Sequence, residues 1–600
     1  MALIATICTS VARLGGIVMN GVRPLIRRRP MPSHDLPADL PDILKRVYAA
    51  RGVTKPEELE RGLAALPHYH NLGGMGKGLD LLQQALREQW SIFIVGDYDA
   101  DGATSTALVM EALRGCGAHR LSYLVPNRFT QGYGLSPALV EAAKKQGAQL
   151  LITVDNGVAA HVGVSAAKAA GMAVIVTDHH LPGNTLPPAD ALINPNLPGD
   201  LFPGKSLAGV GVAFYLMTAL RARLRDTGWF RERALAELNL AELLDLVAVG
   251  TVADVVPLDA YNRILVEQGL RRIRAGRARP GIRALLKVSG RDPARLTASD
   301  LGFAVGPRLN AAGRLDDMAV GIECLLSKDE DAALVLAQRL DTLNRERRAL
   351  EQEMREQAMA TVEQAFSQLD GLSLPEVLCL HDARWHEGVV GLVAGRLKDR
   401  FHRPAVVFAC AEDGSLKGSA RSIPGVHIRD VLADIAARRP GMLKHFGGHA
   451  MAAGLSLEPA HLETFPEELI CSLRRLTDPE VLQPVVWTDG ELGPDEINLA
   501  HAEALRAGGP WGQGFPEPLF DGFFTIQQAR EVGRGHLKLR LGDPRTGALH
   551  DAIAFNYNEL GVRPDLEKAR FVYRLEVNDW RGERTHQLSI QASGLEIQAG

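Results

Sequence analysis

Between residues 91 and 195, short apolar runs alternate with segments whose apolar residues recur at helical spacing. The runs have the length of strands that are buried on both faces, and their alternation with helices is typical of a doubly wound parallel sheet. We therefore predict an α/β domain in this region. Its predicted strands are 92–97, 121–126, 149–155, 173–178 and 191–194, and its predicted helices are 103–115, 136–146 and 160–170.

The segments on either side of this region, 35–90 and 206–253, are predicted to be mainly helical. Further along, residues 328–370 contain neither glycine nor proline, and leucines recur on one helical stripe. A single helix of this length would span roughly 60 Å and would connect two domains. Two shorter helices joined by a turn are the alternative.

A second α/β region is predicted at about 375–465, and short alternating strands follow from about 485 to the end. The alternation predicts an all-β barrel, for which a five-stranded oligonucleotide-binding (OB) barrel and a small sandwich are the two candidates. The predicted strands of this part are 485–492, 520–528, 536–541, 549–555, 571–578 and 587–593. We divide the chain into an extension (1–34), an α/β domain with N-terminal helices (35–325), a connector helix (326–371), a second α/β domain (372–480) and the barrel (481–600).

Composition narrows the class of protein. The 600 residues are 46% hydrophobic and 23% charged, as expected of a globular protein with several domains. The net charge of −4 means that any site for a polyanion must be a local patch. The six cysteines are scattered without CxxC pairing, which favours a reducing cytoplasm and argues against structural zinc. We see no apolar run long enough for a membrane span.

The first 34 residues contain no acidic residue and carry several arginines, which follow the apolar part. That order is the reverse of a secretory signal. The segment is interpreted as a disordered or additional extension, as an organelle transit peptide, or as the product of a start codon assigned too early, with Met19 and Met31 as alternatives.

Three carboxylates stand at alternate positions directly after the first predicted strand: Asp97, Asp99 and Asp101. Carboxylates this close repel one another unless a cation or hydrogen-bond donors hold them. An aspartate in this place often only caps the next helix, but that explains one of the three. The cluster therefore favours a divalent-cation site.

Other strands of the same predicted sheet also end in polar residues: Asn127 and Arg128, Asp155, and Asp178-His-His180. In open α/β sheets, ligands bind outside the carboxyl ends of the strands, so these residues are expected to meet. Asp254 lies in an apolar surround, where a carboxylate needs a partner. Aspartates with one or two histidines suit Mg²⁺ or Mn²⁺, and a pair of ions would serve hydrolysis at phosphorus. No P-loop motif is present.

Four segments occur in the order that is typical of the DHH phosphoesterase superfamily: Asp97-Tyr-Asp-Ala-Asp-Gly102, Thr153-Val-Asp-Asn-Gly157, Asp178-His-His180 and Val252-Ala-Asp254. Gly418-Ser-Ala-Arg-Ser422 and Gly447-Gly-His449 resemble the associated DHHA1 domain. Within the superfamily, the chain resembles the RecJ family of single-strand-specific 5′→3′ DNA exonucleases over roughly residues 35–597. The segments that carry this closer likeness are 127–136, 206–215, 306–314 and 509–518.

The resemblance implies the ligands of two divalent cations, Mn²⁺ or Mg²⁺, with Asp155 bridging them. The ligands would be Asp97, Asp99, Asp155, His179 and Asp254, and His180 would contact the scissile phosphate. Asp101 would be an auxiliary ligand, or would cap the helix that begins near Ala103.

The same resemblance implies contacts with DNA by Arg128, Tyr133, Arg308, Asn310 and Arg314. Arg128 and Tyr133 would line a narrow entry that favours single strands, with Tyr133 stacking on a base; plain packing is the alternative for Tyr133. A pocket for a 5′-phosphate would use Arg314, Ser419, Arg421 and His449. A buried structural role is the alternative for His449.

Three functions compete. The first is a single-strand exonuclease that acts in DNA repair and recombination beside a single-stranded-DNA-binding protein and a helicase, as a monomer. The second is a small-molecule phosphatase or cyclic-dinucleotide phosphodiesterase of the same superfamily, which would need neither the barrel nor the connector. The third is an inactive scaffold, which would have lost metal ligands. The length and the intact ligand set favour the first.

Overall fold

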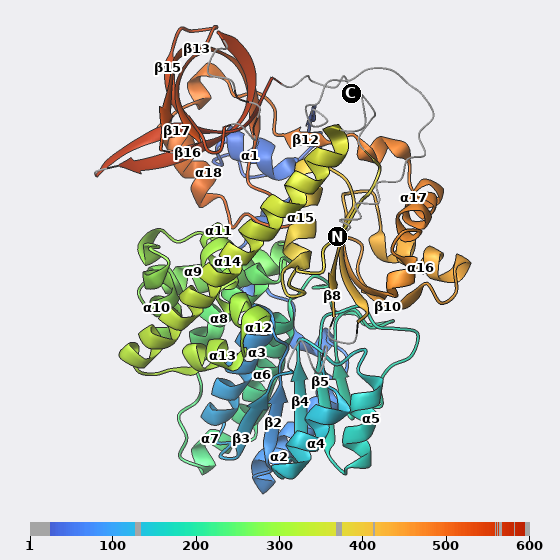
Figure 1. The fold of residues 1–600 in the computed structure, drawn as a ribbon. Helices are drawn as coiled ribbons and strands as arrows, with labels where there is room; N and C mark the ends of the chain where they lie inside the picture. Colours follow the sequence, from blue (N-terminus) through green and yellow to red (C-terminus); the bar gives the residue numbers. More distant parts are fainter. Residues whose placement is uncertain are drawn as a thin grey trace.

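The computed structural model describes residues 24–594, apart from 127–133, 368–374, 412–413, 534, 558–559, 561, 563–566 and 581. Arg128 and Tyr133 therefore lie outside the described residues. None of the helices in the described part is both long enough and apolar enough to cross a bilayer. Figure 1 shows two α/β domains, a long helix that crosses between them, and a barrel.

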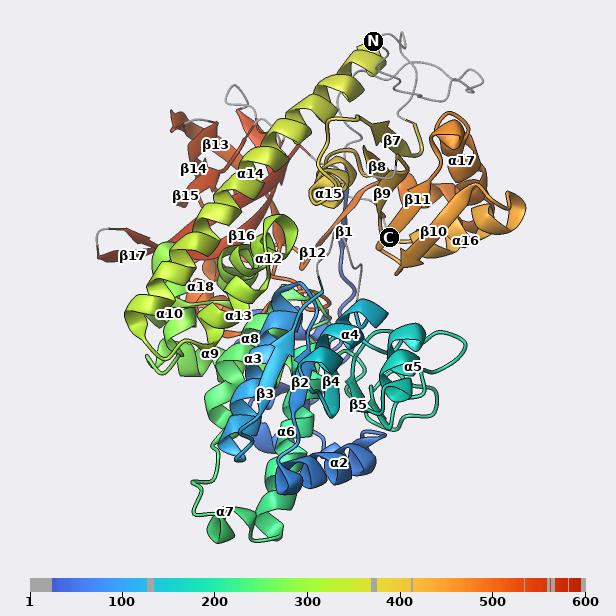
Figure 2. The same ribbon diagram turned by 60° about the horizontal axis from the view of Figure 1, so that its bottom comes forward.

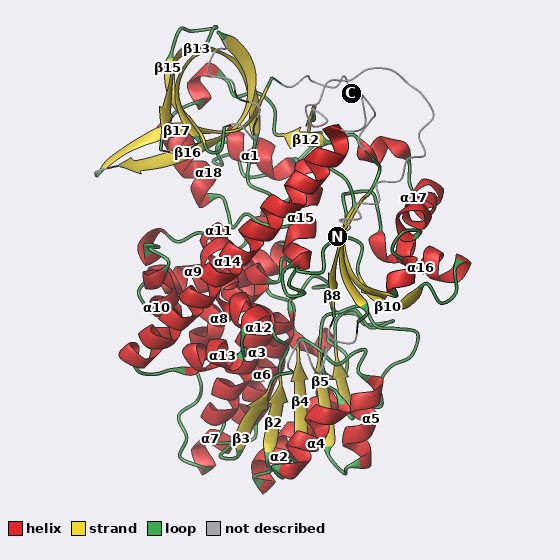
Figure 3. Cartoon of the chain, in the orientation of Figure 1, coloured by secondary structure: helices red, strands yellow, loops and turns green. Residues whose placement is uncertain are grey.

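The parallel sheet predicted from residues 91–195 is confirmed. Its strand order is β3-β2-β4-β5-β6, and every neighbouring pair is parallel. The central strands β2 and β4 are buried along their whole length, because helices cover both faces. The elements are β2 (Ile92–Val95), α3 (Ala100–Gly115), β3 (Leu121–Leu124), α4 (Pro137–Lys145), β4 (Leu150–Val154), α5 (His161–Ala169), β5 (Ala173–Thr177) and β6 (Ala191–Ile193). The arrowheads of β2, β4 and β5 point toward the centre of the molecule (Figure 3).

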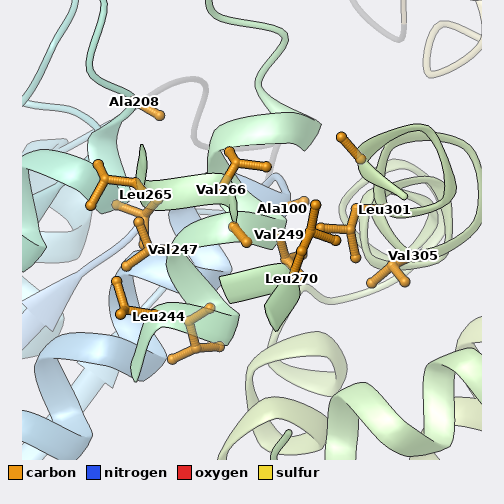
Figure 4. Close-up of a cluster of buried hydrophobic side chains, with 14 of the residues drawn as sticks. Ala100, Ala208, Leu244, Val247, Val249, Leu265, Val266, Leu270, Leu301 and Val305 are labelled. Atoms are coloured by element: carbon orange, nitrogen blue, oxygen red, sulfur yellow. The ribbon is translucent and has the colours of Figure 1, made fainter. Parts of the chain in front are cut away.

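A helical layer follows the sheet and packs on α3. Figure 4 shows how Val247 and Val249 of one helix and Leu265, Val266 and Leu270 of the next form one apolar cluster. This cluster holds the helix that ends at Asp254 against the rest of the domain. The helices are α6 (Gly209–Asp226), α7 (Trp229–Glu232), α8 (Leu244–Ala253), α9 (Ala260–Arg274), α10 (Pro280–Val288), α11 (Ala298–Asp300), the π-helical turn η6 (Leu301–Val305), α12 (Gly306–Leu315) and α13 (Ala319–Leu326).

The connector is one helix, α14 (Glu330–Ser367), and not two. Its first half packs on α10, α12 and α13, and its second half packs on α15 of the second domain through Leu350, Met354 and Ala358 (Figure 2). The long-helix prediction is therefore confirmed. Because each half of α14 is held by a different domain, the helix fixes the distance between them.

The second domain is a five-stranded mixed sheet with the order β10-β11-β9-β8-β7. Only β7 and β8 are parallel; the other pairs are antiparallel. Its elements are β7 (Leu378–His381), α15 (Val390–Phe401), β8 (Ala405–Cys410), β9 (Leu416–Arg421), α16 (Ile428–Arg438), β10 (Leu443–Gly448), β11 (Ala452–Leu457) and α17 (Phe465–Leu476).

The C-terminal part forms a closed barrel with the strand order β13-β14-β15-β17-β16, which decides for the barrel over the sandwich. The barrel strands are β13 (Phe520–Val532), β14 (His536–Gly542), β15 (Leu549–Ala554), β16 (Lys568–Trp580) and β17 (Glu583–Ser593), and α18 (Leu499–Ala507) precedes them. The first strand predicted for this part lies outside the barrel. It is β12 (Val485–Thr488), which pairs in parallel with β1 (Leu25–Arg28).

Of the alternatives for the extension, disorder is wrong for β1. Arg28 of this strand donates two hydrogen bonds to the buried carboxylate of Asp521 in the barrel, over 3.1 and 2.7 Å. A four-residue strand carries too little periodicity to be recognised, and its partner lies more than 450 residues away. Downstream, α1 (Asp42–Ala49) also contacts the C-terminal part, where Tyr48 donates to the carbonyl of Gly508; α2 (Met75–Glu88) follows. The domain limits at 34, 325, 371 and 480 remain our proposal.

Candidate active site

The carboxyl ends of β2, β4 and β5 bring the predicted ligands together. Asp155 directly follows β4, Asp178 directly follows β5, and Asp97 lies two residues beyond β2. In three groups of residues, one donor atom from each member lies within 4.8 Å of the others. Asp155 and His179 each belong to two groups, so the three groups form one centre. The groups are Asp97, Asp99 and Asp155; Asp155, His179 and His180; and Asp101, His179 and Asp254.

The inner atoms of this centre face one another. Nε2 of His179 lies 3.1 Å from Oδ1 of Asp155 and 3.4 Å from Oδ2 of Asp254. Nε2 of His179 and Oδ2 of Asp254 are buried and form no hydrogen bond with the described residues. A buried polar atom without such a bond is costly, and a divalent cation would supply the missing partner. Carboxylate oxygens with imidazole nitrogen fit Mn²⁺ or Mg²⁺.

The electrostatics of the centre also favour a cation. Burial, followed by the charge of Asp254, raises the pKa of Asp101 to about 7. Burial, followed by the charge of Asp99, raises the pKa of Asp254 to about 7, and burial raises the pKa of Asp155 well above its usual value. Several buried carboxylates that repel one another in this way are stabilised in the ionised form by a bound cation.

Asp101 is held by the start of α6. Its two carboxylate oxygens accept hydrogen bonds from the backbone N–H groups of Gly209 and Val210, over 2.7 and 2.9 Å. The residue that caps α3 is instead Asp99, which accepts from the N–H of Gly102 over 3.0 Å. The alternative in which Asp101 caps the helix near Ala103 is therefore wrong: Asp101 joins the N-terminus of α6 to the centre.

Asp178, to which sequence reasoning assigned no role, orients His180. The Nδ1 atom of His180 lies 2.7 Å from Oδ1 of Asp178, and the N–H groups of His179, His180 and Val158 also donate to this carboxylate. Burial alone would raise the pKa of Asp178, but these bonds lower it. Burial alone would lower the pKa of His180, but the bond to Asp178 raises it to about 9. The Asp178 carboxylate therefore fixes the orientation of the His180 imidazole.

Two asparagines were also missed. Nδ2 of Asn194 donates to the carbonyl of His180 over 2.8 Å, and Nδ2 of Asn196 donates to the carbonyl of His179 over 2.6 Å. They fix the backbone of the histidine pair from the loop after β6. The signal in the sequence was their position at the end of the last predicted strand of the sheet, 191–194, and just beyond it.

The helix α12 supports the segment 97–101 at the start of α3, which we call the aspartate loop. Oδ1 of Asn310 accepts from the N–H of Ala100 over 2.7 Å. A side chain at Gly313 would place its Cβ only 1.8 Å from the carbonyl oxygen of Tyr98, so this close approach requires glycine. Arg308 is buried and donates to Asp341 over 2.9 Å and to the carbonyl of Ala304 over 2.7 Å. Its guanidinium joins α12 to α14, and a contact of Arg308 with DNA remains a prediction.

Arg314, Ser419 and Arg421 meet at the N-terminus of α15, although they come from both α/β domains. Nη1 of Arg421 donates to Oγ of Ser419 over 2.9 Å, and Nη1 of Arg314 donates to the carbonyl of Gly388 over 3.1 Å. A Cβ on Gly391 would lie 2.7 Å from Nη2 of Arg421. Arginine forks beside a helix N-terminus are suited to a phosphate. Gly388 and Gly391 were missed in the sequence.

His449 extends from the second domain toward the metal-ligand centre. Its ring centroid lies 5.8 Å from that of His180, with the planes inclined by 27°. The residue is exposed, so the alternative of a buried structural histidine is wrong. The site is therefore formed where the two α/β domains meet.

A carboxylate and histidine centre of this kind, on the edge of a parallel sheet and faced by a second α/β domain, defines the class of DHH phosphoesterases. Three family models match the chain in order: "DHH family, N-terminal domain" (91–251), "DHHA1 domain" (374–473) and "RecJ OB domain" (488–592). The chain is 56% identical to the single-stranded-DNA-specific exonuclease RecJ of Dickeya dadantii, over 96% of this chain and 99% of that protein. The chain belongs to the RecJ family.

Solved structures agree. The crystal structure of RecJ from Thermus thermophilus in complex with Mn²⁺ has a TM-score of 0.76 and 31% identity, and the match covers 94% of this chain and 78% of that one. The complex of the same protein with Mg²⁺ has a TM-score of 0.70 and 29% identity, over 94% of this chain and 76% of that one. The predicted fold class, with its two α/β domains followed by a barrel, is thereby confirmed.

Proposed function

We propose that this chain hydrolyses single-stranded DNA from the 5′ end to mononucleotides, using two divalent cations. The observation that carries the proposal is the single centre made by three overlapping ligand groups, which share Asp155 and His179. Overlapping groups of donors of this kind suit two neighbouring ions with one bridging carboxylate. Membership of a family whose relatives are named single-stranded-DNA-specific exonucleases supports DNA as the substrate.

The proposed ligands are Asp97, Asp99, Asp155, His179 and Asp254. Mn²⁺ or Mg²⁺ at such a site activates a water and stabilises charge during displacement at phosphorus. His180, held by Asp178, is placed to donate a hydrogen bond from Nε2 to the scissile phosphate. Asp101 keeps the N-terminus of α6 against the centre and is at most an auxiliary ligand.

The direction of degradation is proposed from the phosphate pocket. Arg314, Ser419 and Arg421 would bind the terminal 5′-phosphate, and His449 would contact the nucleotide between this pocket and the metals. A strand anchored by its 5′ end places its first internal phosphate at the metal centre, so that one nucleotide is released in each cycle. Arg128 and Tyr133 remain proposed contacts of the entering strand. Asn310 remains a proposed contact of the strand end.

The test is an oligonucleotide labelled at one end or the other, incubated with Mn²⁺ or Mg²⁺ beside a duplex control. We expect stepwise shortening of the single strand from its 5′ end and little loss of the duplex. Shortening from the 3′ end would contradict the placement of the phosphate pocket. Hydrolysis of a dinucleotide without degradation of the strand would favour the small-molecule alternative instead.

The two other functions are less consistent with the structure. An inactive scaffold would have lost ligands, whereas all five proposed ligands converge here. A small-molecule phosphatase would need neither the closed barrel nor the 38-residue connector. By resemblance we further propose a role in DNA repair and recombination, action as a monomer, and partnership with a single-stranded-DNA-binding protein and a helicase.

Divalent cations should stabilise the folded chain. Mn²⁺ at a hundred times its dissociation constant should raise the free energy of unfolding by about 2.7 kcal/mol, because it binds the folded state alone. Scanning calorimetry with Mn²⁺ and with EDTA would measure the shift in Tm. Asp254→Asn should remove most of the shift, while Asp226→Asn, an exposed change at the end of α6, should leave it intact. An equal shift in both variants would contradict the assignment of Asp254.

Asp178→Asn should lower kcat about tenfold, since loss of a residue that orients an active-site histidine typically costs 10- to 100-fold. The amide cannot accept all the bonds that the carboxylate accepts, and its neutral charge should lower the pKa of His180. A pH–rate profile would therefore shift together with kcat, whereas KM for the strand should change little. A fall in stability with an unchanged pH profile would mean that Asp178 has only a structural role.

A further inference from the structure

A groove of about 590 Å³ is lined in part by Arg314 and Arg421. Its walls are one face each of α12, α14 and α15, three helices that lie side by side in Figures 1 and 2. The volume is in the range of about 300–1,000 Å³ that small-molecule sites occupy. Nothing in the proposed reaction uses most of its lining.

The lining is strongly cationic. Six arginines line the groove, against the two acidic residues Glu351 and Asp399. Glu351 is already engaged, because it pairs with two of these arginines over 2.9 Å each. Arg348 and Arg355 form no hydrogen bond or ion pair with any described residue. Guanidinium groups gathered in this way are suited to an anion with several oxygens. The six are Arg314, Arg347, Arg348, Arg355, Arg396 and Arg421.

An aromatic side chain lines the same groove. Phe303, in the π-helical turn before α12, is 73% exposed, the second-highest exposure among the large hydrophobic residues of the described part. An exposed ring costs hydration free energy unless a ligand covers it, and bases stack on such rings with about 1–3 kcal/mol. A nucleotide site needs cationic groups that bind the phosphate and an aromatic ring that stacks on the base, and this groove has both.

The groove continues into the proposed active site. Arg314 and Arg421, which we propose as ligands of the terminal 5′-phosphate, belong to its lining. Asn310, also in the lining, is bonded to the N–H of Ala100 in the aspartate loop. A nucleotide cut from the 5′ end therefore has its phosphate at the inner end of the groove when it is released.

We propose that this groove binds a nucleoside 5′-monophosphate and is the route by which the product leaves. The inference rests on the proposed 5′-end hydrolysis. Cleavage of the P–O3′ bond adds the oxygen of water to the phosphorus of the next nucleotide and leaves a hydroxyl on the released one. The released nucleotide keeps its 5′-phosphate for the arginines and its base for Phe303.

The binding test uses the full chain in EDTA, so that catalytic cations cannot recruit the phosphate. Equilibrium dialysis with radiolabelled dAMP should show one bound nucleotide. The double variant Arg348→Gln/Arg355→Gln should weaken binding at least about tenfold, because two charge-assisted contacts are lost. Arg400→Gln, an exposed change on α15 outside the lining, is the matched control and should bind dAMP as the unaltered chain does.

The base is tested separately. Phe303→Ala should weaken binding of dAMP about fivefold or more but leave deoxyribose 5-phosphate unaffected, since only the former has a base to stack. Equal binding of dAMP and inorganic phosphate, unaffected by Phe303→Ala, would overturn the nucleotide assignment in favour of a plain anion site. Binding that survives the double arginine variant but is lost in Arg421→Ala would place the nucleotide in the phosphate pocket alone, and would also overturn the proposal.

The route is tested with a strand carrying a 5′-³²P label. After a single turnover and rapid gel filtration, labelled mononucleotide should stay with the unaltered chain and be lost from the double variant. Retention of added dAMP without retention of the product would overturn the exit route and indicate a site for free nucleotides. Degradation from the 5′ end without binding of dAMP would overturn this inference while leaving the proposed function intact. Degradation from the 3′ end would contradict the proposed function itself, and with it this inference.

Discussion

Asp155→Asn is expected to lower the rate of single-strand hydrolysis by about a thousandfold, as when one group that stabilises transition-state charge is removed. Asp155 is buried and belongs to two ligand groups, and its Oδ1 lies 3.1 Å from Nε2 of His179. We therefore expect no other residue to take over its role as a ligand. Its backbone has a φ of 61°. Asparagine tolerates a positive φ better than most residues do. The substitution therefore tests the loss of the charge without disturbing the fold.

The measurement pairs steady-state hydrolysis in Mn²⁺ with fluorescence anisotropy of a labelled strand in EDTA. Strand binding should remain within about twofold, because phosphate contacts by arginine carry most of the affinity. Asp226→Asn should change neither quantity. Turnover in Asp155→Asn within tenfold of the unaltered chain would show that Asp155 does not bridge the two cations.

Arg421→Ala is expected to reduce the preference for a 5′-phosphorylated over a 5′-hydroxyl strand by about 10- to 100-fold in kcat/KM, the range of a lost bidentate contact with a phosphate. The guanidinium is positioned by Ser419 and lies against Gly391 at the start of α15. The effect should be confined to phosphorylated ends, since a hydroxyl end makes no such contact.

Both substrates should be compared in the same preparation, so that a loss of folded protein cancels from the ratio. Lys417→Ala removes a positive charge from an exposed position of the same strand and should leave the preference unchanged. A preference that survives Arg421→Ala would remove this residue from the phosphate pocket, and would also remove the inner end of the groove described above.

The sequence was informative where one local pattern determined one local structure. The buried strands before Asp97, Asp155 and Asp178 were recognisable because a parallel sheet leaves apolar runs with polar ends. The connector was recognisable because 43 positions without glycine or proline favour one helix over any other structure. The convergence of strand ends then followed from the topology of open sheets.

Reasoning failed where a partner lies far away in the chain. The strand β1 has four residues and pairs with β12, and no short stretch of sequence indicates that pairing. The bond of Arg308 to Asp341 of the connector was equally invisible in the sequence. Of the two alternatives for Asp101, the cap of its own helix is wrong, because its carboxylate accepts from the start of α6, 108 residues later. Each of these outcomes depends on which elements pack together.

The sequence by itself thus determined the class of chemistry, because ligand types and their order at strand ends are local properties. Only the tertiary structure decided the geometry of the site. It showed that Arg314 and Arg421 reach one pocket from two domains, that His449 faces His180, and that α12, α14 and α15 enclose an arginine-lined groove. The physical reason is that burial and close contact between distant segments come from packing, which acts on the folded chain and leaves no periodic trace in the sequence.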